Sequence, residues 1–189
     1  MAKEIAFASS NREKIFEVGQ ILSEYGIKVV PIDADLNEIR SENQGEVAVQ
    51  KAKTAFGMCK TPVIAEDTGV YFKAYENFPG VFPSFVFRSL GYDGILRLLH
   101  EKNRGAYFKT ILAYFDGEKT ETFEGICKGE ITQVPDEKRY QNPKLPYEAI
   151  FVPSGKKVRF SRMSKQEKAE ISHRAKAVRK FAEWYQNKQ

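Results

Sequence analysis

Apolar residues recur along this chain at two periods, and these periods predict both strands and helices. A short apolar run at residues 4–9 ends in small polar residues, and from Arg12 to Tyr25 the apolar positions recur at spacings of three and four. This spacing marks one face of an amphipathic helix, which Gly26 is placed to end. Residues 27–32 form a second apolar strand, so the opening unit has the order of a parallel crossover.

The pattern then repeats at a second helix and strand. After an acid-rich loop at 33–46, residues 47–59 have helical spacing, and the apolar run 62–65 leads directly into Glu66-Asp67-Thr68-Gly69. We expect the strand to end in a turn there. Both carboxylates would then lie at its C-terminal edge, where open α/β sheets bind ligands.

The middle of the chain predicts antiparallel pairing. Residues 78–91 are aromatic and interrupted by prolines and a glycine, and we expect a helix from about 93 to 102. Strands at 107–115 and 119–134 flank Asp116-Gly117, a dipeptide typical of tight hairpins. We therefore expect an α/β fold with a mixed central sheet shared by two lobes, helices packed around it and a cleft between the lobes. Residues 1–189 would form a single domain.

Near the C-terminus the sequence predicts two helix starts. Ser164 and Glu167 form a capping box, and Ser172 can cap a second helix. Ser172, His173 and Arg174 would then lie at a helix N-terminus, where N–H groups and the dipole favour an electronegative ligand. An exposed histidine without a role is the alternative for His173, and we assign no role to His100.

Composition and charge narrow the class of protein. With 42% apolar residues the chain can bury a substantial core, and Cys59 and Cys127 lack the spacing of a metal or redox site. No apolar run reaches membrane-spanning length and the first residues do not match a signal peptide, so we expect a cytoplasmic protein. Residues 156–188 hold eleven Lys and Arg against three acids, which predicts a polyphosphate or nucleic-acid partner.

The segment that links the first strand to the first helix has the chemistry of a phosphate-binding loop. It reads Ser9-Ser10-Asn11-Arg12-Glu13-Lys14. Small hydroxyl residues let the backbone approach phosphate oxygens, the Asn11 amide can bond them, and the Lys14 charge lies near the same helix end. The segment lacks the glycines of a Walker loop, and taken alone it is more often an ordinary capped helix start.

Carboxylates form a second candidate site. Glu66 and Asp67, with Glu38 and Glu42 in the acidic loop, offer the few carboxylates that magnesium uses beside water and phosphate oxygens. A carboxylate next to the metal can accept the proton of an attacking water. The alternative is that these carboxylates only cap a turn, and the neighbouring phosphate loop favours a site.

Taken in order, these segments resemble the inosine triphosphate pyrophosphatase family. Its motifs T/S-x-N-x-x-K, E/D-D-S/T-G and E-K-x-x-x-S-H-R match residues 9–14, 66–69 and 167–174, and a Pro-Gly-aromatic stretch matches 78–91. The resemblance covers nearly the whole chain. It implies a magnesium-dependent homodimeric enzyme that hydrolyses non-standard purine nucleoside triphosphates, such as ITP, dITP and XTP, to the monophosphate and pyrophosphate.

The resemblance also implies residue roles. The phosphate ligands would be Ser9, Ser10, Asn11, Lys14 and Lys51. The metal would be held by Asp67 with Glu38, or with Glu42 in another alignment, and catalysis would use Asp67 as the general base beside Lys14 and Glu66. The 6-oxo purine would be recognised by Lys168, Ser172, His173 and Arg174, because a 6-amino group would leave their hydrogen-bond donors unpaired.

One segment departs from the family pattern. Where the family has G-F/W-G-Y/W-D-P-x-F, residues 144–151 read KLPYEAIF. Leu145 replaces the aromatic that stacks on the base and Glu148 replaces the aspartate at its edge, while Tyr147 and Tyr140 are alternative stacking residues. Stacking contributes roughly 1–3 kcal/mol in comparable sites, so we expect a changed affinity or base preference with unchanged phosphate chemistry.

Three other functions are compatible with parts of the sequence. A Maf-type nucleotide pyrophosphatase has a similar fold, but residues 172–174 argue against it. A basic nucleic-acid-binding module would use the C-terminal lysines and arginines without catalysis, although a solvated face at Lys176, Arg179 and Lys180 is the simpler interpretation. A silent nucleotide sensor conflicts with an intact Asp67 and Lys14. We expect neither nucleic acid nor membrane as a partner.

Overall fold

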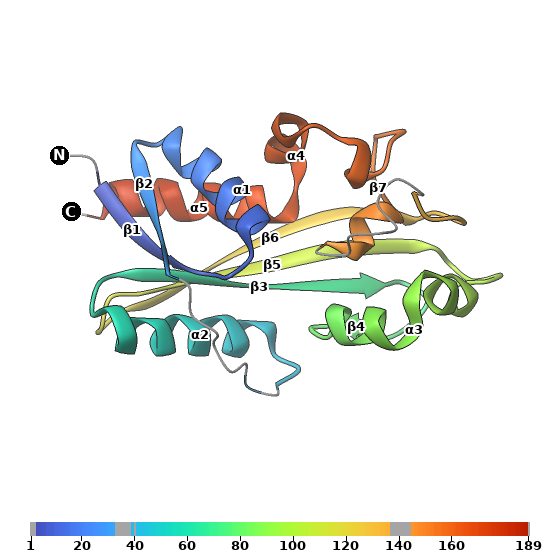
Figure 1. Cartoon of the computed structure of the whole chain (residues 1–189), viewed down its shortest axis with the longest axis horizontal. Coiled ribbons are helices and arrows are strands. Elements are labelled where there is room, and N and C mark those ends of the chain that lie inside the picture. The colour runs from blue at the N-terminus through green and yellow to red at the C-terminus, as the bar shows by residue number, and fades with distance from the viewer. Residues whose placement is uncertain (1–2, 33–38, 40, 137–144, 189) are drawn as a thin grey trace.

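The protein is built on one curled, mixed sheet that runs through two lobes (Figure 1). The computed structural model describes residues 3–32, 39, 41–136 and 145–188. The elements are β1 (Lys3–Ala8), α1 (Arg12–Ser23), β2 (Ile27–Ile32), α2 (Gln44–Cys59), β3 (Val63–Phe72), β4 (Pro79–Gly80), α3 (Pro83–Leu98), β5 (Gly105–Phe115), β6 (Thr120–Ile131), the 3-10 helix η2 (Pro146–Ala149), β7 (Phe151–Pro153), the 3-10 helix η3 (Phe160–Arg162), α4 (Lys165–Ile171) and α5 (His173–Asn187).

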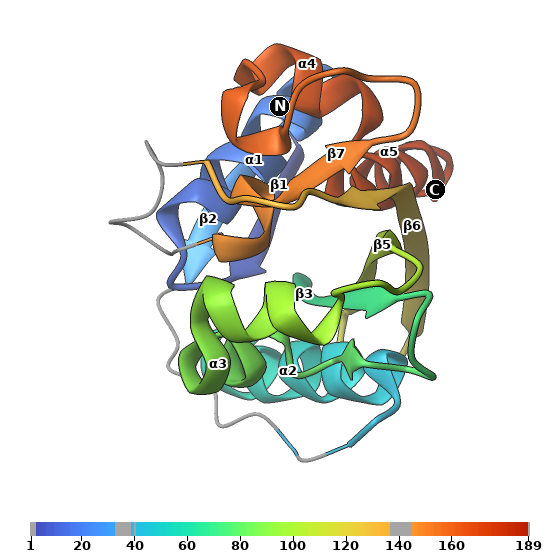
Figure 2. The ribbon, with the colours of Figure 1, turned by 90° about the vertical axis from the view of Figure 1, so that its right-hand side faces the viewer.

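The strand order is β2-β1-β3-β5-β6-β7, with β4 also paired to β3. β1 pairs in parallel with β2 and β3, and the other pairs are antiparallel. Figure 2 shows α1, α4 and α5 on one side of the sheet and α2 with α3 on the other. The predicted α/β fold and its opening crossover are confirmed.

The long strands β3, β5 and β6 join the two lobes because each contributes to more than one apolar core. In β3, Ile64 packs with α1 and α5, whereas Val63 and Ala65 face α2. Further along the same strand, Val70 and Phe72 belong to the core of the other lobe, with α3, η2 and β7.

Among the described residues, no helix is long and apolar enough to cross a membrane.

The expectation that β3 ends before Glu66 is wrong. The strand continues through Glu66-Asp67-Thr68-Gly69 to Phe72, because β5 pairs with all ten of its residues. Thr68 and Gly69 favour turns locally, but this long antiparallel pairing outweighs that preference. Gly69 is needed for a different reason: a Cβ there would lie 2.7 Å from the carbonyl oxygen of Gly80 in β4.

The starts of two helices also differ from expectation. α2 begins at Gln44 rather than residue 47, because the Asn43 side chain caps it by accepting from the N–H groups of Gly45 and Glu46. α3 begins at Pro83, inside the aromatic stretch and before the expected start at about residue 93, and a proline is well tolerated at the first helical position. This helix kinks at Gly91 and ends at Leu98, before the expected residue 102.

The hairpin between β5 and β6 is wider than a two-residue turn. Asp116 accepts hydrogen bonds from the backbone N–H groups of Glu118 and Lys119 at 3.1 and 2.8 Å. β6 therefore starts at Thr120, opposite Phe115, and it ends at Ile131 rather than at residue 134.

Candidate active site

A pocket of about 400 Å³ lies where β1 ends beside β3. β1 pairs with β3 only up to Ala65, and β4 pairs with it from Val70, and between these partners Glu66 and Thr68 border the pocket. Its walls contain charged and polar side chains as well as aliphatic and aromatic ones. The lining residues are Ala8, Ser9, Ser10, Asn11, Lys14, Lys51, Glu66, Thr68, Val70, Pro83, Ser84, Phe108, Leu145, Pro146, Tyr147, Glu148, His173 and Arg174.

The predicted phosphate loop lines this pocket and also caps a helix. Asn11 is the N-cap of α1, and its side-chain oxygen accepts from the N–H groups of Glu13 and Lys14 at 3.0 and 3.4 Å. The Ser9 hydroxyl accepts from the Asn11 N–H at 3.2 Å. The two interpretations of this segment are therefore compatible, because the capped helix start presents Lys14 and the helix N-terminus to the pocket.

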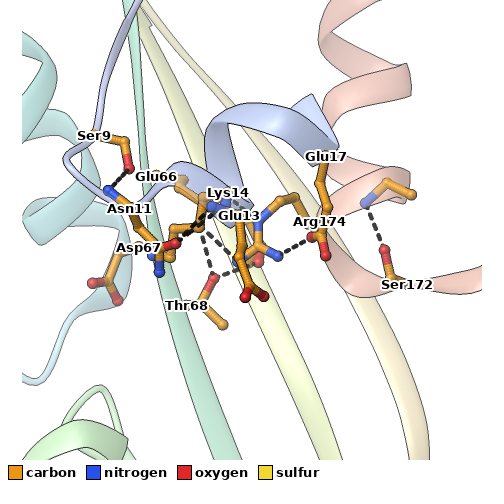
Figure 3. A network of polar contacts seen from close by, with 12 residues as sticks. Ser9, Asn11, Glu13, Lys14, Glu17, Glu66, Asp67, Thr68, Ser172 and Arg174 are labelled. Carbon is orange, nitrogen blue, oxygen red and sulfur yellow. Dashed lines mark hydrogen bonds and ion pairs between the residues drawn. The ribbon is translucent and has the colours of Figure 1, made fainter. Parts of the chain in front are cut away.

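Glu66 and Asp67 point to opposite sides of β3, since side chains alternate along a strand (Figure 3). Glu66 faces the pocket, 3.0 Å from the Lys14 ammonium and within 2.8 and 3.0 Å of two Arg174 nitrogens. Asp67 lies on the α2 side, 3.3 Å from the Lys51 ammonium. The two carboxylates therefore have separate cationic partners.

The environment keeps Glu66 ionised. Burial favours its neutral form, but the charges of Arg174 and Lys14 outweigh burial and lower the pKa of Glu66 far below 4.5. A carboxylate with so low a pKa is a poor proton acceptor. Its contacts instead hold the Lys14 and Arg174 side chains in fixed places.

Buried charges continue from Arg174 toward α4. Glu17 of α1 accepts from Arg174 at 2.5 Å and from Lys168 at 3.3 Å, and Lys168 also contacts Glu148 at 2.9 Å. Burial disfavours the charged form of Lys168, but the carboxylates of Glu148 and Glu17 raise the pKa of Lys168. Both basic side chains thus remain charged, and Figure 3 shows Glu17 beside Arg174.

His173 is one of the rings that line the pocket. Its ring is 4% exposed and stacks on Phe108, with centroids 4.7 Å apart. Burial first, and then the nearby Arg174 charge, lower the pKa of His173 well below 6.5, so the imidazole is neutral. Its Nδ1 has no hydrogen-bond partner in the described part of the chain. Gly125 of β6 lets the backbone of His173 lie close to the sheet, because a Cβ at Gly125 would lie 2.0 Å from the His173 carbonyl oxygen.

A sequence profile of the Ham1 family matches residues 5–184. The chain belongs to the Ham1 family. The resemblance drawn from the motifs is thereby confirmed. The chain is 38% identical over 186 residues to the dITP/XTP pyrophosphatase of Methanopyrus kandleri, with 97% of each chain covered. It is 36% identical to the dITP/XTP pyrophosphatase of Hyperthermus butylicus, with 97% of this chain and 95% of that protein covered.

A solved Ham1 protein from Coxiella burnetii has a similar structure. Its TM-score to this chain is 0.79 at 25% sequence identity, with 98% of this chain and 99% of that one covered. The Ham1 fold thus brings together most residues that the motifs selected.

Some predicted residues of this Ham1 chain lie behind the pocket wall. Ser172 caps α5 by accepting from the Ala175 N–H, and Lys168 contacts Glu148, which lines the pocket. Asp67 lies beside Lys51, which does line the pocket. Glu38 and Tyr140 lie outside the described residues, and Glu42 is exposed. Among the described residues, no group of three or more His, Cys, Asp or Glu side chains is arranged to hold a metal ion.

Sequence reasoning did not select several residues in and beside the pocket, and three of them make contacts that shape the site. Thr68 lines the pocket and shares a 2.8 Å hydrogen bond with Thr110, and Phe108 supports His173. Glu17 joins two basic side chains. Thr68 follows the acidic pair directly and could have been included on that ground.

Proposed function

We propose that this Ham1 protein hydrolyses ITP, dITP and XTP to the corresponding monophosphate and pyrophosphate. The observation that carries this proposal is one pocket whose lining combines the hydroxyl and cationic side chains of Ser9, Lys14 and Lys51 with the rings of His173 and Phe108. A nucleoside triphosphate has the matching distribution of charge and aromatic surface. The two archaeal relatives are named for dITP and XTP, which supports the same substrates here.

In the proposed reaction, the phosphate tail binds at the N-terminus of α1. The Lys14 and Lys51 ammonium groups balance its charge, together with the backbone and side chains of Ser9, Ser10 and Asn11. Asp67 accepts the proton of a water molecule, and the oxygen of this water bonds to the α-phosphorus. The anhydride bond between the α- and β-phosphates then breaks and pyrophosphate leaves. Glu66 acts by holding Lys14 and Arg174.

We propose that the enzyme uses magnesium. A carboxylate oxygen of Asp67, beside substrate phosphate oxygens and water, is the hard oxygen donor set that magnesium prefers. Glu38 or Glu42 would supply a second carboxylate, and Glu42 lies two residues before the start of α2, which contacts Asp67. When bound, the metal would neutralise and orient the phosphate oxygens.

Base recognition in this proposal uses His173 and Arg174 at the wall that Glu148, Leu145 and Tyr147 complete. The neutral imidazole, stacked on Phe108, is part of this wall. A base with a 6-oxo group can accept a hydrogen bond from the Arg174 guanidinium, whereas the 6-amino group of adenine cannot. Tyr147 is the aromatic residue of this segment that lines the pocket.

We also propose that residues 1–189 act as one unit, in the cytoplasm and as a homodimer. β3, β5 and β6 run through both lobes, which supports a single unit (Figure 1). α3 and the residue before it expose Phe82, Phe85 and Leu90, which supports a partner on that side.

The decisive experiment is a pyrophosphate-release screen with ITP, dITP, XTP and the four standard triphosphates, with and without magnesium. We expect release from the first three triphosphates in magnesium and little release without it.

Asp67→Asn should lower kcat by roughly 10²–10⁴-fold, since it removes the proton acceptor. Asp93→Asn changes an exposed residue of α3 and is the control, and its kcat should equal that of the wild type. Wild-type turnover by Asp67→Asn would remove Asp67 from the mechanism.

A further inference from the structure

Gln44 is the first residue of α2, and both the nitrogen and the oxygen of its side-chain amide form hydrogen bonds. It is 4% exposed. Its Nε2 donates to the backbone oxygens of Asp67 at 2.9 Å and of Lys109 at 2.8 Å, and its Oε1 accepts from the Tyr71 hydroxyl at 3.1 Å. The start of α2 is thus tied to two neighbouring strands, β3 and β5, at the level of the acidic pair.

The same face of α2 contacts Asp67 a second time. Lys51 follows Gln44 by seven residues, which is about two helical turns. Its ammonium lies 3.3 Å from the Asp67 carboxylate and 3.4 Å from the backbone oxygen of Glu66. Asp67 is therefore held twice by one helix, through its backbone at Gln44 and through its side chain at Lys51.

Tyr71 fixes the orientation of the Gln44 amide. Its ring stacks on Tyr107 with centroids 4.8 Å apart and planes 5° apart, and the Lys109 ammonium lies 5.1 Å from its centre. Burial, followed by Tyr107 and Asp67, raises the pKa of Tyr71 to about 12, so the hydroxyl stays protonated at neutral pH. A protonated hydroxyl donates to the amide oxygen, which turns the Gln44 NH₂ group toward the two strands.

We propose that Gln44 is a positioning residue that sets Lys51 against Asp67 and anchors the end of the acidic loop beside them. The inference rests on the proposed function, because it gives Asp67 and Lys51 their catalytic use. A shift of α2 along the sheet would move the lysine and the loop end together. Catalysis that depends on placed charges is sensitive to such a shift, even at about 1 Å.

The test replaces Gln44 by methionine, which keeps the length of the side chain and removes its hydrogen bonds. We expect kcat for dITP to fall by roughly 10–100-fold, with KM within about threefold. Gln50→Met is the matched control on the same helix, because Gln50 is exposed and its amide donates to the neighbouring Thr54 at 3.5 Å. That variant should keep the wild-type kcat.

Tyr71→Phe provides a second route in case Gln44→Met folds poorly. It removes the hydroxyl that orients the amide, so we expect a smaller fall in kcat than for Gln44→Met. The double variant should be no slower than Gln44→Met alone, because both changes act on one network. Additive losses would show that the two residues act independently and would overturn the proposed role.

A crystal structure of Gln44→Met separates this inference from the proposed function. We expect the Lys51 ammonium to leave ion-pair distance of Asp67. If it stays in place, or if kcat equals that of an active wild type, Gln44 does not position the site. A wild type without pyrophosphatase activity would refute the proposed function instead, and the distance would still decide the role of Gln44.

Discussion

At the scale of single residues, His173 gives the molecule a measurable response to pH. Its pKa is lowered well below 6.5 by burial and by Arg174, so the folded state does not bind the proton that the unfolded state binds below about pH 6.5. The free energy of unfolding should therefore fall as the pH is lowered from 7.5 to 5. A one-unit difference in pKa corresponds to about 1.4 kcal/mol, so this group contributes at most about 2 kcal/mol by pH 5.

The measurement is urea unfolding at several pH values for the wild type and for His173→Phe, which keeps a ring against Phe108. The variant should lose less stability than the wild type over this range. If both proteins show the same pH dependence, His173 is protonated in the folded state and the neutral imidazole is wrong.

The residues that sequence reasoning missed have partners far away in the chain. Glu17 lies three residues after Lys14 on the polar side of α1, where a charged residue is ordinary. Its partners, Lys168 and Arg174, are 151 and 157 residues later, and no local spacing indicates such pairing. Phe108 likewise looks like any apolar strand residue. By contrast, Lys14 and Arg174 belong to motifs whose residues are close in the chain, so the sequence was sufficient to select them.

At the scale of elements, two tyrosine hydroxyls hold η2 against α3. The Tyr147 hydroxyl donates to the backbone oxygen of Pro83, and the Tyr92 hydroxyl donates to that of Pro146, each at 3.0 Å. Pro83, Pro146 and Tyr147 all line the pocket. These hydrogen bonds thus fix two walls of the site that come from different parts of the chain.

Tyr147→Phe should therefore affect both stability and binding. Removing one buried hydrogen bond costs about 1–2 kcal/mol of unfolding free energy, and the loosened wall should raise KM for dITP several-fold with little change in kcat. Tyr75→Phe is the matched control, because its hydroxyl donates to Leu98 at the other end of α3, away from the pocket. A similar loss of stability without a change in KM is expected for the control. Equal KM values for the two variants would contradict the role of η2 and α3.

The elements themselves were predictable where local pattern and tertiary packing agree. β2 has the predicted bounds, and α1 and α5 begin at the predicted residues, because their apolar spacing matches the faces that they bury. β3 and α3 were misjudged because turn-forming residues lie inside them. In β3 the pairing with β5 outweighs the preference of Thr68 and Gly69, and in α3 the proline stands at the first helical position.

At the scale of the whole molecule, charge and apolar surface together constrain how two copies can meet. The chain carries a formal net charge of +5, so two copies repel each other unless apolar surface offsets the repulsion. The C-terminal basic residues are partly used within the chain, since Lys176 and Lys180 donate to backbone oxygens of Ile126 and Glu124. Large apolar side chains are exposed at α3, where Phe85 is 62% exposed. This surface is the reasonable contact for the proposed homodimer.

Phe85→Glu should convert the dimer to a monomer, because it adds a charge that the interface would have to bury. Size-exclusion chromatography with light scattering at micromolar protein checks the mass. Met58→Glu is the matched control, since Met58 of α2 is 61% exposed, and that protein should remain dimeric. Phe85 itself does not line the pocket, so the Phe85→Glu monomer should keep kcat/KM for dITP within about threefold of the wild type. A monomeric wild type would refute the homodimer, and a dimeric Phe85→Glu protein would move the interface away from α3.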